Sequence, residues 1–300
     1  MSLLVVGSVA LDNIETPTDR RKNILGGSAM FGAFAASFFG PVQLVGVVGE
    51  DWPTEHTRYL EARGIDMSGL EIPKGGKTFR WTGKYLENMN DRETLETQLN
   101  VLGDFEPKLP ESFRRARYAL LGNGSTKTQH MVIDQLSAPE LVIADTMNLW
   151  IDLERPELLR LMTRIDGLVL NDSEAKMLTG ESNTITAGRK LLTMGPKFVV
   201  VKKGEHGSLF FAECETYVIP AYPTENLVDP TGAGDCFAGA MLGYIASVGK
   251  VEPETIKRSL AYGAVVAASC VEGFSTEQLE SLTREDIDRR LNDLRQMTQF

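Results

Sequence analysis

The sequence has few cysteines and histidines, and their spacing argues against two kinds of structural site. The three cysteines, Cys214, Cys236 and Cys270, form no Cys-x-x-Cys pair, and their odd number does not suit a disulfide framework. The three histidines lie far apart, without the spacing of zinc ligands. We therefore expect reduced thiols, as in a cytoplasmic protein, and no zinc site.

The sequence also lacks an excess of positive charge and any long apolar run. Its 31 lysines and arginines face 41 aspartates and glutamates, which gives a formal net charge of −10. This balance argues against nucleic acid and membranes as partners, but it allows a small anion bound by backbone N–H groups. No segment approaches the roughly 18 apolar residues of a membrane helix. The start, MSLLVVGSVALD, has no basic region and soon reaches Asp12, so we expect a strand there rather than a signal peptide.

What the sequence has in quantity is apolar residues, 42% of the total, many of them in short runs that end at glycine or a polar residue. Strands of a parallel sheet that is buried on both faces have this pattern, and the helical patterns between them supply the crossovers. The sequence therefore predicts an α/β fold with a mostly parallel sheet covered on both faces, in one domain over residues 1–300. The expected strands are Leu3–Gly7, Val42–Gly49, Tyr118–Gly122, Leu141–Asp145, Gly167–Asn171 and Lys197–Gly204, and a helix is expected at Gly27–Gly40.

One segment, Lys77–Leu102, departs from this alternation. Trp81 and Tyr85 share one parity and polar residues occupy the other, which is typical of strands with one solvent-exposed face. We expect an antiparallel lid inserted into the domain, from segments near 13–25 and 76–102, although an ordinary edge hairpin would give the same pattern. Unpaired strand edges in such a lid would allow a homodimer to form through it.

The stretch DPTGAGDCFAGA, residues 229–240, carries the strongest chemical signal. It does not fit a dinucleotide-binding fingerprint, because Phe237 holds the third glycine position and helical patterns follow. The segment Glu71–Thr78 ends in Gly-Lys-Thr like a phosphate-binding loop, but it lacks the first glycine and a strand pattern follows it. The expected C-terminal helices are Gly234–Val248, Pro253–Val271 and Arg284–Met297.

Gly232, Ala233 and Gly234 instead fit an anion-binding site at the start of a helix. The first N–H groups of a helix have no partner within it, and small residues let phosphate oxygens approach them. Asp235 falls in the first turn, where the helix dipole favours its ionised form. A carboxylate beside an anion hole suits phosphoryl transfer to an alcohol, with Asp235 as the general base. The residues alone leave an alternative open, which is that Asp235 is an ordinary acid at a helix start.

The same stretch resembles the C-terminal signature of the PfkB, or ribokinase-like, family of carbohydrate and nucleoside kinases. Further segments similar to that family follow its order along nearly the whole chain: GSVALD (7–12), LGGSAMFGAFAASFFGPVQLVGVVGED (25–51), LNDSEA (170–175) and VVVKKGEHGSLF (199–210). The resemblance implies a ribokinase-like three-layer α/β/α sandwich with a small antiparallel β-lid. It also implies that ATP, with Mg²⁺, phosphorylates a hydroxyl group, usually a primary alcohol of a sugar or nucleoside.

The resemblance implies roles for individual residues as well. Asp235 would be the catalytic base, and the backbone of Gly232, Ala233 and Gly234 would form the anion hole. Glu174 would hold Mg²⁺ through water together with Asn171, which without the family would read as a cap at a strand end. The substrate would meet Asp12, Gly26, Gly27, Phe31, Trp81 and Asn148, and the nucleotide would meet Asn171, Lys202, Gly204, Gly207, Thr231 and Gly273. Asp229 matches part of the K⁺ site that some members have.

One position departs from the family pattern, because Phe31 stands where an asparagine usually touches the substrate. An aromatic ring can stack on a base or on the apolar face of a sugar, and Trp81 adds similar surface in the lid. These residues favour a nucleoside over a small open polyol, although Phe31 could equally pack in the core. Two other functions stay open: a kinase of another hydroxylated metabolite, such as a vitamin or aminosugar, and a nucleotide-binding regulatory protein that no longer catalyses. The intact Asp235 argues against the last.

Overall fold

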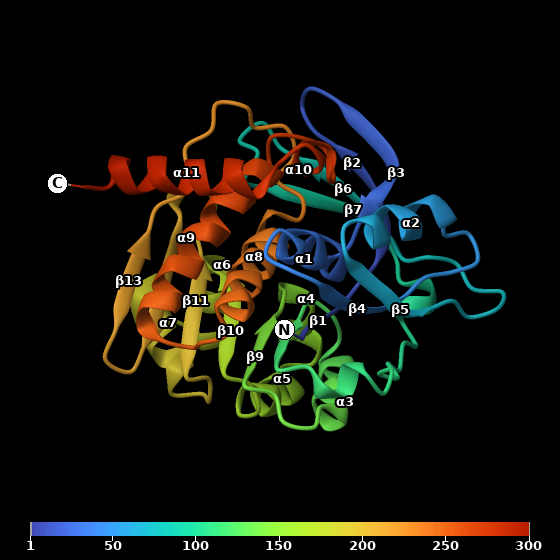
Figure 1. Cartoon of the computed structure of the whole chain (residues 1–300), viewed down its shortest axis with the longest axis horizontal. Coiled ribbons are helices and arrows are strands. Elements are labelled where there is room, and N and C mark those ends of the chain that lie inside the picture. Colours follow the sequence, from blue (N-terminus) through green and yellow to red (C-terminus); the bar gives the residue numbers. More distant parts are fainter. Residues whose placement is uncertain (1, 300) are drawn as a thin grey trace.

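A computed structural model, which describes residues 2–299, contains a large sheet with helices on both faces (Figure 1). Its strands are β1 (Leu3–Val6), β4 (Val42–Val47), β5 (Ile65–Glu71), β8 (Tyr118–Leu121), β9 (Leu141–Asp145), β10 (Gly167–Asn171), β11 (Phe198–Lys202), β12 (Ser208–Ala212) and β13 (Thr216–Ile219). Their spatial order is β13-β12-β11-β10-β9-β8-β1-β4-β5, and the pairings made by β12 are antiparallel while the others are parallel. The predicted, mostly parallel α/β sheet is confirmed.

The central strands explain why helices cover both faces of this sheet. On β1, Leu3 and Val5 belong to one hydrophobic cluster, and Leu4 and Val6 belong to the other. Side chains of successive strand residues point to opposite faces, so each face needs its own covering layer. The first layer holds α1 (Ser28–Ser37), α2 (Thr54–Ala62), α8 (Ala233–Val248), α9 (Pro253–Cys270), α10 (Glu277–Glu280) and α11 (Arg284–Met297). The second holds α3 (Thr126–Gln135), α4 (Asn148–Leu153), α5 (Arg155–Met162), α6 (Asp172–Thr179) and α7 (Thr184–Leu192).

Helices α1 and α8 approach each other so closely that glycine is required between them. A Cβ atom on Gly239 would stand 2.1 Å from the backbone oxygen of Gly32, and one on Gly243 would stand 2.9 Å from the Cα of Ala36. A side chain at Gly239 could not be accommodated unless one of the helices moved, because the atom it would meet belongs to the backbone. We call this contact the glycine seam. It fixes the position of α8, and therefore of its N-terminal turn, against α1.

A second, smaller sheet forms the lid. Its strands are β2 (Ala10–Glu15), β3 (Arg20–Gly26), β6 (Arg80–Tyr85) and β7 (Arg92–Gln98), in the order β3-β2-β6-β7. β2 and β6 are parallel, whereas the two hairpins β2–β3 and β6–β7 are antiparallel. In Figure 1 these strands lie together on one side of the molecule, close to α10.

The start of the lid corrects one expectation from the sequence. We expected the lid to begin near residue 13, but β2 begins at Ala10, so Asp12 lies within the lid sheet. The chain crosses between the sheets at Ser8, whose hydroxyl accepts a hydrogen bond from the backbone N–H of Ser28 at 3.0 Å. The apolar residues before and after Gly7 and Ser8 therefore belong to strands in two different sheets. Within residues 2–299, no helix is long and apolar enough to cross a membrane.

Candidate active site

Three neighbouring parallel strands end in polar residues at the same edge of the large sheet. Asp145 ends β9, Asn171 ends β10 and Lys202 ends β11, and Asn171 pairs directly with Lys202 in the sheet register. The carboxyl ends of parallel strands form one edge, where open α/β folds bind ligands. The Nζ of Lys202 lies 2.8 Å from Oδ2 of Asp145, and the two side chains are only 16% and 6% exposed. A buried ion pair therefore occupies the centre of this edge.

Asn171 and Glu174 hold each other in place at the start of α6. Oδ1 of Asn171 accepts a hydrogen bond from the Glu174 N–H at 2.8 Å, and the Asn171 N–H donates to Oε2 of Glu174 at 2.7 Å. This reciprocal capping box satisfies two N–H groups that the helix leaves unpaired. Asn171 is thus a helix cap, as its place at a strand end allowed, and the cap fixes the carboxylate of Glu174 near Lys202 and Asp145.

The glycine-rich stretch forms the first turn of α8. Gly232 has φ 79°, in the left-handed region, and a Cβ atom on it would lie 2.4 Å from the ring of Phe31. A Cβ atom on Gly234 would lie 2.8 Å from the Nζ of Lys202. The absence of side chains therefore lets an aromatic ring support the turn from one side and an ammonium group approach it from the other. Phe31 is only 2% exposed, which favours its interpretation as a core residue over stacking on a substrate.

The charges at this edge are strongly coupled. Burial and the charge of Asp145 together raise the pKa of Asp235 to about 7, although the charge of Lys202 lowers it. The same causes raise the pKa of Glu174 to about 7. Burial disfavours the charged form of Lys202 and so lowers its pKa. The negative charges of Asp145, Glu174 and Asp235 outweigh this effect, and the pKa of Lys202 is raised. We expected the helix dipole to favour ionised Asp235; burial and the neighbouring acid prevail instead.

Asp12 and Asp229 form a second acidic pair, at the junction of the lid and the large domain. The two residues are 5% and 1% exposed. Burial raises the pKa of Asp12 to about 8, with a further contribution from the charge of Asp229. Among residues 2–299, Oδ1 of Asp12 and Oδ2 of Asp229 have no hydrogen-bond partner. Buried acceptors without partners are rare in proteins, and a ligand is one way to satisfy them.

Glycines surround Asp12 on the side of α1. A Cβ atom on Gly26 would lie 2.0 Å from Oδ2 of Asp12, so the carboxylate lies directly against that backbone. Gly27 has φ 97° and precedes the first residue of α1. The structure therefore brings together three of the residues expected to meet the substrate: Asp12, Gly26 and Gly27.

The lid reaches the large domain at two points. The hydroxyl groups of Tyr85 and Thr231 are 3.0 Å apart, directly before the Gly232 turn. At the lid tip, Nδ2 of Asn90 donates to Oε1 of Glu205 at 3.0 Å, in the short 3₁₀ turn Gly204–His206 after β11. The lid thus contacts both the helix start and one of the turns expected to meet nucleotide.

Some residues that we expected to meet the substrate do not lie with the acidic residues described above. Asn148 is exposed at the start of α4, and within residues 2–299 no hydrogen bond connects its side chain to the acidic residues. Trp81 folds over Gly83 on its own strand, and its indole N–H donates to Thr94 at 3.2 Å. Gly207, with φ 77°, turns the chain into β12, and Gly273 lies in the turn after α9. The Asp145–Lys202 pair was not foreseen, because nothing in the sequence shows that β9 and β11 flank β10.

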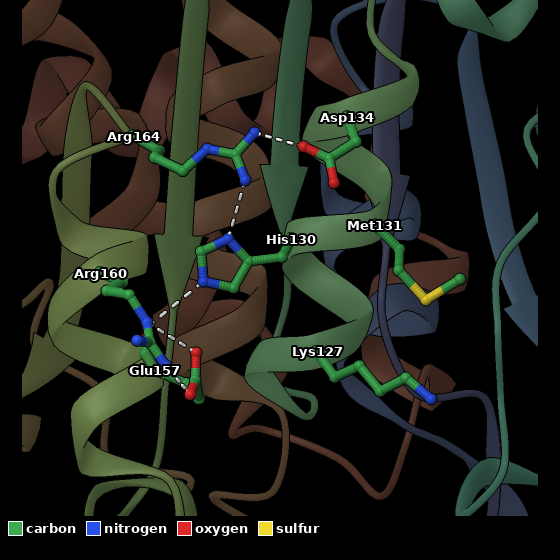
Figure 2. Close-up of a pocket in the computed structure, with 7 residues that line it drawn as sticks. All are labelled: Lys127, His130, Met131, Asp134, Glu157, Arg160 and Arg164. Carbon is green, nitrogen blue, oxygen red and sulfur yellow. Dashed lines mark hydrogen bonds and ion pairs between the residues drawn. The ribbon is translucent and has the colours of Figure 1, made fainter.

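A cavity of about 440 Å³ lies elsewhere, against α3 and α5 (Figure 2). The residues that line it are Lys127, His130, Met131, Asp134, Glu157, Arg160 and Arg164. Its cations already have partners: Arg164 pairs with Asp134 at 2.5 Å, Lys127 pairs with Glu106 at 2.6 Å, and Arg160 pairs with Glu157. None of the acidic residues described above lines it, so this cavity is separate from the site at the sheet edge.

Comparison with known proteins shows the family and the fold of this chain. A family model described as "pfkB family carbohydrate kinase" matches residues 2–281. A cytidine kinase from Thermococcus kodakarensis is 30% identical over 248 residues, which cover 81% of this chain and 87% of that protein. A Burkholderia thailandensis nucleoside kinase, solved in complex with inosine, is 20% identical with a TM-score of 0.81 over 97% of both chains. A putative ribokinase II from E. coli, solved with ATP and Mg²⁺, is 18% identical with a TM-score of 0.81, over 97% of this chain and 99% of that chain.

Proposed function

The chain belongs to the pfkB family of carbohydrate kinases, and from this membership we propose its reaction and the residues that carry it. The protein is an ATP-dependent sugar or nucleoside kinase with a ribokinase fold. Its reaction is the transfer of the γ-phosphoryl group of ATP to a hydroxyl, a primary alcohol, of a nucleoside. The observation that carries this proposal is the half-buried carboxylate of Asp235 in the first turn of α8, beside Gly232 and Gly234.

Asp235 acts as the general base. A pKa of about 7 lets a large fraction of the carboxylate be ionised near neutral pH and still accept a proton readily from a hydroxyl. The N–H groups of Gly232, Ala233 and Gly234 hold the negative charge on the transferred phosphoryl group, where the helix dipole adds to them. Lys202 contributes positive charge at the same place, because its ammonium group lies against Gly234.

The residues around Glu174 fit a Mg²⁺ ion held through water. Asp145, Glu174 and Asp235 place three carboxylates around one ammonium group, and a divalent cation would relieve their repulsion. Residues 2–299 offer no cluster of three acidic, histidine or cysteine residues that could bind a metal directly. Mg²⁺ prefers oxygen ligands and keeps several of its waters, so Glu174 and Asn171 would hold those waters. The ion would neutralise phosphate charge during transfer.

The acceptor site lies at Asp12. Its Oδ1, which has no partner among residues 2–299, can accept hydrogen bonds from the hydroxyls of a ribose, and the missing side chain of Gly26 lets the carboxylate lie against that backbone. The cytidine kinase relative supports a nucleoside as the acceptor. Among the described residues, Oδ2 of Asp229 has no hydrogen-bond partner, and Oδ1 accepts the Thr231 N–H at 2.9 Å, which suits a K⁺ ion beside the anion hole.

Three further proposals complete the function. The nucleotide meets Gly204, Gly207, Thr231 and Gly273, on the side of the site that the lid tip contacts. The protein works in the cytoplasm as one domain carrying a lid. It forms a homodimer through lid strands, of which β7 is an exposed edge strand.

The experiment that tests the function is ATP turnover against a panel of nucleosides, sugars, vitamins and aminosugars, with Mg²⁺ present. We expect phosphorylation of one or more nucleosides, and a loss of about 10²–10⁴ in kcat for Asp235→Asn, because the base is removed. Equal turnover by the wild type and Asp235→Asn would contradict the mechanism. A preference for another acceptor class would contradict the substrate, and binding of ATP without turnover would favour the regulatory alternative.

A further inference from the structure

The chain that leads into the anion hole, residues 220–232, forms neither helix nor strand, and we call it the connecting loop. It joins β13 to the first turn of α8. A long segment without secondary structure keeps one position only if contacts with other parts of the molecule hold it. Such contacts lie at the end of α9, where the N–H groups of Val228 and Asp229 donate to the carbonyl of Val271 at 2.8 and 3.2 Å. The thiol of Cys270 also donates to the carbonyl of Thr231 at 3.6 Å.

Glu272, the next residue, connects the connecting loop to the C-terminal helix α11. Nη1 and Nη2 of Arg290, on α11, donate to Oε1 and Oε2 of Glu272 at 3.1 and 2.8 Å. The hydroxyl of Thr224, in the connecting loop, donates to Oε1 of the same carboxylate at 2.8 Å. One carboxylate therefore receives hydrogen bonds from both the helix and the loop.

The guanidinium group of Arg290 is itself held from two sides. Its Nη1 donates to the hydroxyl of Ser269, in α9, at 2.9 Å, and its Cζ lies 5.3 Å from the centre of the Tyr222 ring, in the connecting loop. The side chains of Arg290 and Glu272 are 21% and 8% exposed, so water screens this ion pair far less than a surface pair. A bidentate contact between a guanidinium and a carboxylate fixes orientation as well as distance.

We infer that Arg290 is a positioning residue for the proposed phosphoryl transfer, because through Glu272 it fixes the connecting loop and hence the Gly232 turn. This inference rests on the proposed function and goes beyond it, since the family model ends at residue 281, before α11. Arg290 acts through Glu272 and the connecting loop rather than by contact with substrate. The N–H groups of an anion hole stabilise charge only at hydrogen-bonding distance, and a displacement of about 1 Å can cost roughly 10²-fold in rate.

The test uses Arg290→Met and Arg290→Lys in the full-length enzyme, with MgATP and the best acceptor from the panel. Arg290→Met should lower kcat about 10- to 10²-fold, while KM for ATP and for the acceptor changes less than about threefold, because only the anion hole is displaced. Arg290→Lys can still pair with Glu272 through a single ammonium group, so it should retain part of the rate.

Arg284→Met is the matched control. Arg284 lies on the same helix and also attaches it to α9, because its Nη2 donates to the hydroxyl of Tyr262 at 3.1 Å. Within residues 2–299 it forms no hydrogen bond with the connecting loop. Arg284→Met should lower Tm and leave kcat unchanged. An equal loss of kcat in Arg284→Met and Arg290→Met would overturn the inference, because attachment of α11 in general would then account for the rate.

The double variant Glu272→Met/Arg290→Met separates positioning from stability. Arg290→Met alone leaves a buried carboxylate without its partner, so its Tm should fall. Replacing both residues by methionine removes the unpaired charge, and most of the Tm should return. The kcat should nevertheless stay as low as in Arg290→Met, because the connection to the loop is still lost. Recovery of kcat together with Tm, or a kcat of Arg290→Met within threefold of the wild type, would overturn the inference.

Amide hydrogen exchange keeps this test separate from that of the proposed function, because it needs no substrate. The N–H groups of Val228 and Asp229 should exchange roughly tenfold faster or more in Arg290→Met than in the wild type, and at the wild-type rate in Arg284→Met. Equal exchange in the wild type and Arg290→Met would overturn the role of Arg290 whatever acceptor the enzyme proves to use. Asp235→Asn turnover, in contrast, judges the proposed base alone.

Discussion

The carboxyl edge of the large sheet and the inner face of the lid are built in opposite ways. The edge consists of buried strand ends and a helix start, whose positions follow from sheet register and from backbone contacts at glycine. The lid is a small sheet whose strand β7 is exposed along its whole length. The groups proposed for chemistry belong to the rigid edge, and several groups proposed to choose the acceptor or close the site belong to the lid. Substitutions at the edge should therefore change kcat, and most substitutions in the lid should change binding.

The largest effect is expected at the edge, for Gly232→Ala. The left-handed backbone costs a residue with a Cβ roughly 1–2 kcal/mol, and overpacking against Phe31 costs about 1–3 kcal/mol. The free energy of unfolding should fall by about 2–5 kcal/mol by these two costs. The displaced N–H groups should lower kcat by about 10²–10³. Denaturant unfolding and steady-state kinetics measure both.

Gly249→Ala is the control, because it isolates the backbone cost. Gly249 caps the other end of α8 with φ 75°, and a Cβ atom there meets nothing within 4 Å. This variant should lose only roughly 1–2 kcal/mol of stability and keep its kcat. If the two variants behave alike, the contact between Phe31 and Gly232 does not hold the anion hole in place.

A smaller effect is expected in the lid, for Asp12→Asn. Unlike Gly232→Ala, this substitution should stabilise the folded protein. The pKa of Asp12 is raised from 3.8 to about 8, so between these values the folded state binds a proton that the unfolded state has lost. The stability of the wild type therefore falls as pH rises through this interval. Asparagine does not ionise, so Tm of the variant relative to the wild type should rise from pH 4 to about pH 8 and then level off.

The same substitution should weaken binding of the nucleoside. Asparagine replaces one of the two carboxyl oxygens with an amide NH₂ group that cannot accept a hydrogen bond, which should raise KM for the nucleoside about tenfold or more, with a smaller change in kcat. Asp19→Asn, in the exposed turn between β2 and β3, is the matched control. The Arg20 N–H and the Arg21 side chain lower the pKa of Asp19, so its removal should not raise Tm at any pH. An Asp12→Asn stability gain that is constant from pH 5 to pH 9 would show that Asp12 is not buried in its neutral form.

The smallest effect is expected at the lid tip, for Asn90→Ala. This variant loses the exposed hydrogen bond to Glu205, worth about 0.5–1 kcal/mol, so KM for ATP should rise about two- to fivefold with kcat unchanged. Glu205→Ala removes the same bond from the other side. The two effects should overlap in the double variant, and full additivity would mean that Asn90 and Glu205 do not act on ATP through one bond.

The layering of the fold and the start of α8 could be predicted because the signals are local. Continuous apolar runs gave the buried strands, and Gly232-Ala233-Gly234 followed by Asp235 gave a helix start with an acid in its first turn. The crossing at Ser8 could not be predicted, because Gly7 and Ser8 mark the end of a strand but nothing in the sequence shows that the next strand joins a different sheet.

The pKa shifts at the active site and the arrangement of the lid could not be predicted for a different reason, because they depend on residues far apart in the sequence. The raised pKa of Asp235 depends on burial and on Asp145, which reaches the same edge through the order of the strands. Strand β7, RETLETQ, is polar except for Leu95, so no pattern marks which of its side chains face the large domain. Their directions are set by the register with β6, which only the folded lid defines.

The glycine seam between α1 and α8 has a consequence for how this enzyme tolerates genetic variation. Gly239 lies one helical turn beyond Asp235, against the backbone of Gly32, so an added methyl group there would push the whole helix away from α1. A displacement of about 1 Å at the reacting groups can cost roughly 10²-fold in rate. A saturation screen that scores only activity would therefore group Gly32 and Gly239 with the active-site residues, although neither is assigned any contact with substrate.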